Sequence, residues 1–164
     1  MSSQYCTKLA EVARGQPLPH YFIKKSHLMS NTQRVSVELK NGKFRLTGGQ
    51  KTDDLNPKSL ILYAAAECAG LTIMGILRKD EITPKRFEIT VEGTLDTPTL
   101  AAESRYRSFA VHYNVECKSL SNQNGVSCAI HEAQEGRCGV VAMLKMIAPV
   151  SHEIAIVSSE TVNV

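Results

Sequence analysis

The sequence predicts an α+β domain in which an antiparallel sheet packs on a long central helix and on shorter helices. Residues 60–77 form a mostly apolar run of helical length, and the segments on both sides of it alternate apolar and polar side chains. Residues 126–146 add two shorter helical stretches. Residues 1–164 are expected to form a single domain, with residues 1–30 a poorly defined N-terminal segment.

Composition and charge exclude several classes of protein. The chain is 43% hydrophobic and 21% charged, which is typical of a globular protein. The formal charge of +3 and the aromatic content of 5% indicate neither a basic surface nor stacking side chains for nucleic acid. The chain has 5 cysteines, an odd number, and no CxxC motif. The first residues do not have the pattern of a secretory signal peptide. We therefore expect a protein of the reducing cytoplasm that binds neither nucleic acid nor membrane.

The N-terminal half predicts a short helix and then a β-hairpin. Residues 8–14 are a candidate helix that ends before Gly15. Residues 35–39 alternate as a strand, and residues 44–46 return after a turn. The dipeptide Asn41-Gly42 between them favours the type I′ turn that joins adjacent antiparallel strands.

The long apolar helix has a well-marked start. Pro57 suits the first helical position, because the N–H that proline lacks would have no partner there. The helix is expected to continue to about Lys79. Glu67 lies in the middle of the apolar run, where a carboxylate is costly in a bilayer, so we expect a buried core helix and not a membrane span. Three N-cap candidates precede the helix: Asp53, Asp54 and Asn56.

The C-terminal half predicts strands and two helices. Residues 87–95 and 109–115 alternate as strands with one buried face. Gly136 divides the helical stretch that follows. The expected elements after these two strands are helices at residues 126–135 and 138–146 and a strand at residues 153–157.

Cys68 lies among small side chains on the predicted long helix. Such a surface lets another backbone approach closely and places the thiol at the contact, whereas a buried structural thiol is the alternative. The neighbouring Glu67 has no cation among its helical neighbours and therefore requires either a partner from outside the helix or a raised pKa. The residues that share the face of Cys68 by helical spacing are Ala64, Ala65, Thr72 and Gly75.

Cys138 is expected at the start of the helix at residues 138–146. Unpaired N–H groups and the helix dipole favour a thiolate there, and Arg137 adds positive charge. A thiol that only fills space is the alternative. Cys117 and Cys128 are interpreted as structural. The spacing of Cys128 and His131 suits a metal ion, but two ligands make a weak signal, so no metal site is expected.

Three segments together resemble the OsmC/Ohr family. They are Asn56-Pro57-Lys58-Ser59-Leu60, Ala65-Ala66-Glu67-Cys68 and Arg137-Cys138-Gly139-Val140, and the order of elements matches from Val35 to Val157. The resemblance implies an OsmC-like fold and an intertwined homodimer. In that dimer the two long helices lie at the centre, and the active sites form between subunits.

The resemblance also implies a thiol-dependent peroxidase that reduces organic hydroperoxides under oxidative stress without a cofactor. Cys68 would attack the peroxide and become a sulfenic acid, and Cys138 would resolve it as a disulfide. An external dithiol would then reduce that disulfide. The family's reductases activate the attacking thiolate with an arginine, for which Arg34 is our candidate and Arg45 the alternative.

One residue departs from the family's hydroperoxide reductases, which carry Glu directly after the Asn-Pro pair. This chain has Lys58 there. A lysine cannot accept N–H bonds from an arginine, and a cation in the first helical turn opposes the helix dipole. We therefore expect slower hydroperoxide reduction than in members with Glu. The alternative is that Lys58 is simply solvated and that another acid, such as Glu67, holds the arginine.

Two further functions stay open. One is a non-catalytic OsmC-like dimer that binds a small apolar ligand or a partner, and the other is a metal-binding module that uses Cys128 and His131. Peroxide consumption with recycling by a dithiol separates the enzyme from the binding protein, and metal analysis of the purified protein tests the module.

Overall fold

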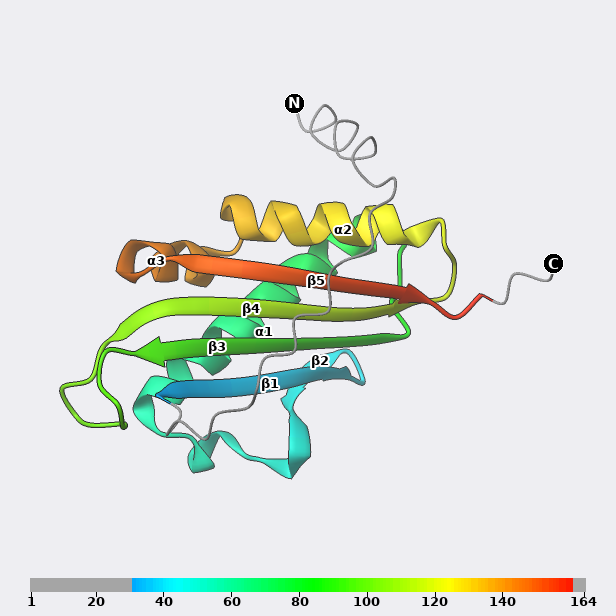
Figure 1. The fold of residues 1–164 in the computed structure, drawn as a ribbon. Helices are drawn as coiled ribbons and strands as arrows, with labels where there is room; N and C mark the ends of the chain where they lie inside the picture. The colour runs from blue at the N-terminus through cyan, green and yellow to red at the C-terminus, as the bar shows by residue number, and fades with distance from the viewer. Residues whose placement is uncertain (1–30, 161–164) are drawn as a thin grey trace, which may run out of the picture.

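The computed structural model describes residues 31–160, so the predicted helix at residues 8–14 lies outside the described part of the chain. In that part, one sheet has the strand order β2-β1-β3-β4-β5, and helix α1 crosses behind it in Figure 1. The strands are β1 (Thr32–Lys40), β2 (Lys43–Leu46), β3 (Arg86–Leu95), β4 (Tyr106–Cys117) and β5 (Val150–Ser158), and the helices are α1 (Pro57–Lys79), α2 (Asn122–Glu132) and α3 (Gly139–Ile147).

The predicted hairpin is confirmed. Strands β1 and β2 pair antiparallel, with Lys40 opposite Lys43 at the turn. Asn41 and Gly42 both adopt positive φ, 52° and 75°, as a type I′ turn requires.

Helix α1 begins and ends as predicted. The side chain of Asn56, one of the three N-cap candidates, accepts hydrogen bonds of 3.0 Å from the backbone N–H groups of Lys58 and Ser59. The helix is long and apolar enough to cross a membrane. One of its faces nevertheless packs on the sheet, and at Gly70 an added Cβ would come within 2.4 Å of the Phe44 ring. This close approach makes α1 the core helix of the domain.

The two C-terminal helices are confirmed, with an unpredicted connection between them. Helix α2 continues into a π-helical turn, Ala133–Arg137, and α3 follows it. Gly136 in this turn has φ of 147°, a backbone conformation that residues other than glycine rarely adopt. The predicted break is therefore confirmed. The turn brings Cys138 to the start of α3.

The α+β class is confirmed, but one strand runs the other way from our expectation. Strands β1 to β4 pair antiparallel, whereas β5 pairs parallel with β4. The chain between β4 and β5 passes through α2 and α3, and such a helical crossover returns the next strand in the same direction. The expectation of an entirely antiparallel sheet is therefore wrong for β5.

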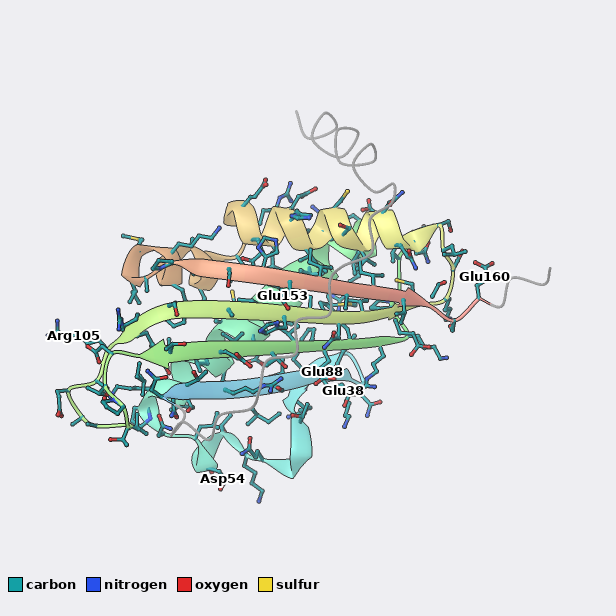
Figure 2. All side chains as sticks on the ribbon, in the orientation of Figure 1. Glu38, Asp54, Glu88, Arg105, Glu153 and Glu160 are labelled. Atoms are coloured by element: carbon teal, nitrogen blue, oxygen red, sulfur yellow. The ribbon has the colours of Figure 1, made fainter. Side chains whose placement is uncertain are left out.

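The sheet has one apolar face and one polar face. The apolar face carries buried side chains such as Val37, Ile89 and Val111, which pack against the helices. The side chains that alternate with them point away from the helices, and Figure 2 labels Glu38, Glu88 and Glu153 among them. A residue of the inner strands β1, β3 and β4 can therefore approach Cys68 on α1 within one protomer only from the apolar face.

Candidate active site

Cys68 and Cys138 lie together between α1 and α3. Their Sγ atoms are 3.2 Å apart, and both cysteines are free thiols. Cys68 is half-buried in the middle of α1, and Cys138 is 0% exposed. The thiol of Cys138 donates a hydrogen bond to the sulfur of Cys68. The two sulfurs are close enough for an oxidant to join them in a disulfide.

Cys138 is the N-cap of α3, as predicted, but its environment does not favour the thiolate. Hydrogen bonds from the backbone of Val140 and Val141 lower the pKa of this thiol, yet burial outweighs them and raises the pKa to about 11. The guanidinium of Arg137 is paired with Glu132, with its Nε 3.0 Å from a carboxylate oxygen, and is not paired with the Cys138 sulfur. Cys138 therefore keeps its proton at neutral pH, contrary to our expectation.

Glu67 has a partner within its own helix, and not from outside it as we expected. The phenol of Tyr63, one turn earlier, hydrogen-bonds to the Glu67 carboxylate. Burial and then the negative charge of Glu67 raise the pKa of Tyr63, while the charge of Arg45 lowers it. A carboxylate, a phenol and a cation thus lie near the turn of α1 that carries Cys68.

The two candidate arginines lie in different places. Arg34 is an exposed residue on the polar face of β1, where its Nε is 3.4 Å from Glu92. Within one protomer the structure does not bring Arg34 and Cys68 together. Arg45 on β2 lies near enough to Tyr63 for its charge to act on that phenol. Arg45 pairs with Glu38 and alternates with the buried Phe44, so its side chain also starts from the polar face, and its link to the site is the charge that acts on Tyr63 from the edge strand β2.

Lys58 connects α1 to the loop between β3 and β4. Its Nζ donates hydrogen bonds to the carbonyl oxygens of Ala101, at 2.8 Å, and Ala102, at 3.1 Å. The Tyr106 hydroxyl in turn donates to the carbonyl oxygen of Lys58, at 2.9 Å. Lys58 therefore anchors this loop, a structural role that the sequence did not indicate.

A buried polar pair near Cys138 escaped the sequence analysis. The Nε2 of Gln134 donates a hydrogen bond to the Tyr113 hydroxyl oxygen, and the two residues are 2% and 0% exposed. The Oε1 of Gln134 is buried and has no hydrogen-bond partner within residues 31–160. Residues 131–137 are mostly polar or charged, so the sequence carried no signal that Gln134 would be buried.

The remaining cysteines and histidines do not form a second site in the described residues. Cys117 is buried, and burial raises the pKa of its thiol. The rings of His131 and His152 pack edge to face with centroids 5.4 Å apart. Within residues 31–160, no group of three or more His, Cys, Asp or Glu side chains is arranged to hold a metal ion.

Comparison with known proteins establishes the family. The family model described as OsmC-like protein matches residues 48–153, which is more than half of the chain. The chain belongs to the OsmC-like family. The matched segment contains Cys68, Cys138 and Lys58, whereas Arg34 and Arg45 lie before it.

Solved structures show the same OsmC-like fold. A hypothetical protein from Aquifex aeolicus is 20% identical with a TM-score of 0.56, and the alignment covers 77% of this chain and 96% of that one. An OsmC-like protein from Mycoplasma pneumoniae is 12% identical with a TM-score of 0.52, covering 77% and 95%. An OsmC-like protein of unknown function from Vibrio cholerae is 12% identical with a TM-score of 0.52, covering 75% and 99%. A search of curated proteins finds no match.

Proposed function

We propose that this OsmC-like protein is a thiol-dependent peroxidase that reduces organic hydroperoxides through Cys68 and Cys138. The observation that carries the proposal is the 3.2 Å separation of their sulfur atoms at the meeting of α1 and α3. The two residues are 70 positions apart in the chain, so the fold itself produces this pair. In a reducing cytoplasm, where we place the protein, such a pair stays available as thiols.

The proposed cycle uses both sulfurs in order. The Cys68 thiolate attacks one peroxide oxygen, the O–O bond breaks, and the alcohol leaves after taking up a proton, so that Cys68 becomes a sulfenic acid. The Cys138 sulfur then attacks the Cys68 sulfur, the S–O bond breaks, and water leaves as the disulfide forms. An external dithiol restores the two thiols by exchange. Cys68 suits the attacking role because it is the more exposed of the two.

The surroundings of Cys68 favour an organic peroxide and a second copy of the chain. Ala64, one turn before Cys68, is exposed. Leu71, about one turn after Cys68, is 53% exposed. Exposed apolar side chains continue along the helix side of the protomer: Leu60, Ile61, Met143, Met146 and Ile147. Exposed apolar surface of this kind is typical of a protein interface or a ligand site. We therefore propose a homodimer with its interface along α1 and α3.

Arg45 is the better-supported activating residue. Its charge acts on Tyr63, which hydrogen-bonds to Glu67 beside Cys68. A carboxylate that is held in place can orient a guanidinium through two parallel hydrogen bonds. Replacing Arg45 with Met should therefore slow sulfenic acid formation more than replacing Arg34 with Met. The opposite order would assign the role to Arg34.

The cysteine variants test the function directly. We expect Cys68→Ser to abolish peroxide consumption, and Cys138→Ser to leave a sulfenic acid on Cys68 that dimedone traps. Cys117→Ala is the matched control, because it removes a buried thiol away from the pair. Equal loss in both Ser variants with no trapped sulfenic acid would contradict the roles. A wild-type protein that consumes no hydroperoxide but retains apolar ligands on its exposed face would instead support the non-catalytic binding protein.

A further inference from the structure

The hydrogen bond between the two cysteine thiols is held in place by the backbone around Cys138. The Sγ of Cys138 is the donor, and it lies 3.2 Å from the Sγ of Cys68. The N–H of Cys138 donates to the carbonyl oxygen of Ala133 at 3.1 Å, and the carbonyl oxygen of Cys138 accepts from the N–H of Ala142 at 3.0 Å. The π-helical turn and the first turn of α3 thus fix the donor from both sides.

Cys138 can serve as a donor because it keeps its proton. The residue is 0% exposed, and the pKa of its thiol is raised to about 11. Burial is the largest cause, and the hydrogen bond to Cys68 and negative charge on Cys68 act in the same direction. At pH 7 only about one in ten thousand of these thiols is therefore ionised.

The acceptor of this hydrogen bond is the sulfur on which the proposed chemistry depends. The thiolate is the nucleophilic form of a cysteine, and a hydrogen bond donated to the charged form favours that form. Such a bond is stronger when the acceptor is ionised and when water is partly excluded. Cys68 is half-buried, and within residues 31–160 no arginine or lysine side chain is hydrogen-bonded to its sulfur. The Cys138 thiol is therefore the donor that one protomer provides to a Cys68 thiolate.

We propose that the Cys138 thiol, before it resolves the sulfenic acid, activates Cys68 for attack on the peroxide by donating a hydrogen bond to the Cys68 thiolate. The inference rests on the two-cysteine cycle proposed above and gives Cys138 a role in both steps. In the first step the Cys68 sulfur bonds to one peroxide oxygen, the O–O bond breaks, and the alkoxide takes a proton from water, while Cys138 keeps its own proton. In the second step the S–S bond forms, the S–O bond of Cys68 breaks, and the Cys138 proton leaves with the hydroxide as water.

Two substitutions of Cys138 in the full-length protein separate the hydrogen-bond donor from the resolving thiol. Neither Cys138→Ser nor Cys138→Ala can form the disulfide, but the serine hydroxyl can still donate to Cys68, whereas alanine cannot. With cumene hydroperoxide at neutral pH, we expect the sulfenic acid on Cys68 to form about tenfold more slowly in Cys138→Ala than in Cys138→Ser, as measured by rapid quenching into dimedone. Cys138→Val also removes the donor and serves if Cys138→Ala does not fold. Equal rates in the donor and the non-donor variants would overturn the proposal.

Alkylation of Cys68 without any peroxide separates this inference from the proposed function. The rate at which iodoacetamide modifies the Cys68 peptide, followed by mass spectrometry as the pH is varied, reports the thiolate. We expect the midpoint of this curve to move upward by about one pH unit in Cys138→Ala and by much less in Cys138→Ser. Easier access beside a smaller side chain would change the rate at the plateau of the curve and not its midpoint.

Thr72→Val is the matched control for a disturbance of this turn of α1. The Thr72 hydroxyl donates to the backbone carbonyl oxygen of Cys68, at 2.9 Å, and not to its sulfur, so its curve should coincide with that of wild type. Coincident curves for Cys138→Ala and Cys138→Ser, or an equal displacement in Thr72→Val, would overturn the proposal even in an active peroxidase. A displacement in Cys138→Ala that Cys138→Ser and Thr72→Val do not share supports it even if the wild-type protein consumes no hydroperoxide.

Discussion

The Nζ of Lys58 lies 2.8 Å from the carbonyl oxygen of Ala101. This hydrogen bond joins the first turn of α1 to the loop between β3 and β4, and a second bond to Ala102 strengthens the connection. A glutamate at the same position would direct a carboxylate toward two carbonyl oxygens. The residue that departs from the family's reductases thus has a structural role in this chain.

Lys58→Glu should therefore destabilise the protein. We expect a loss of about 1–2 kcal/mol in the free energy of unfolding, because two hydrogen bonds from a charged donor disappear and like partial charges meet. Lys58→Met removes the donors without adding a charge and should lose less. Urea denaturation of the three proteins measures the difference. Equal stability of all three would show that the loop does not depend on Lys58.

The same variants test whether Lys58 limits peroxide reduction. Only Lys58→Glu supplies an acceptor for an arginine, so we expect a higher second-order rate with an organic hydroperoxide in Lys58→Glu than in wild type or Lys58→Met. Single-turnover kinetics at a temperature where all three are folded measure it. A rate in Lys58→Glu at or below that of wild type would mean that Lys58 does not limit the site.

Burial of Cys138 should make stability fall at alkaline pH. The thiol's pKa is raised from 9.0 to about 11 in the folded protein, so between these values the unfolded chain releases a proton that the folded chain keeps. The free energy of unfolding that the protonated thiol contributes below pH 9 is therefore lost as the pH rises. We expect a loss of about 1 kcal/mol between pH 8 and pH 10. Urea denaturation under reducing conditions should show a smaller loss in Cys138→Ala. Parallel pH profiles for the two proteins would contradict the assignment.

The proposed dimer depends on the apolar face of α1. We expect wild type to be a dimer at low micromolar concentration by light scattering, and Leu71→Glu to weaken it strongly, because a carboxylate would be buried without a partner. Leu120→Glu is the matched control, since Leu120 is a similarly exposed leucine that precedes α2. A stable wild-type monomer, or equal dissociation in both variants, would count against this interface.

Local sequence signals predicted most of the fold. Asn41-Gly42 identified the hairpin and Asn56-Pro57 the start of α1, because both are short motifs whose effect does not depend on distant residues. The direction of β5 was missed, since alternation of apolar residues is the same in parallel and antiparallel strands. The π-helical turn was missed as well, because it depends on packing around Gly136 and not on periodicity.

The candidate site was predictable only in part. The N-cap position of Cys138 followed from the helix start, but the pKa of its thiol depends on burial among residues that are distant in the chain. Arg34 lies on the face of β1 that points away from α1. The alternation of apolar residues in β1 did not show on which side of the sheet Cys68 would lie. The hydrogen bond between Gln134 and Tyr113 could not be predicted, because it depends on how the π-helical turn packs against β4.

The most direct test of the account is the identity of the disulfide that forms on oxidation. After one equivalent of cumene hydroperoxide and alkylation of the remaining thiols, peptide mapping should show Cys68 linked to Cys138 within one chain, because their sulfurs lie 3.2 Å apart. The dithiol dithiothreitol should restore both thiols and allow a second turnover. Peroxide consumption that leaves Cys68 and Cys138 as free thiols and oxidises another cysteine would contradict the two-cysteine mechanism.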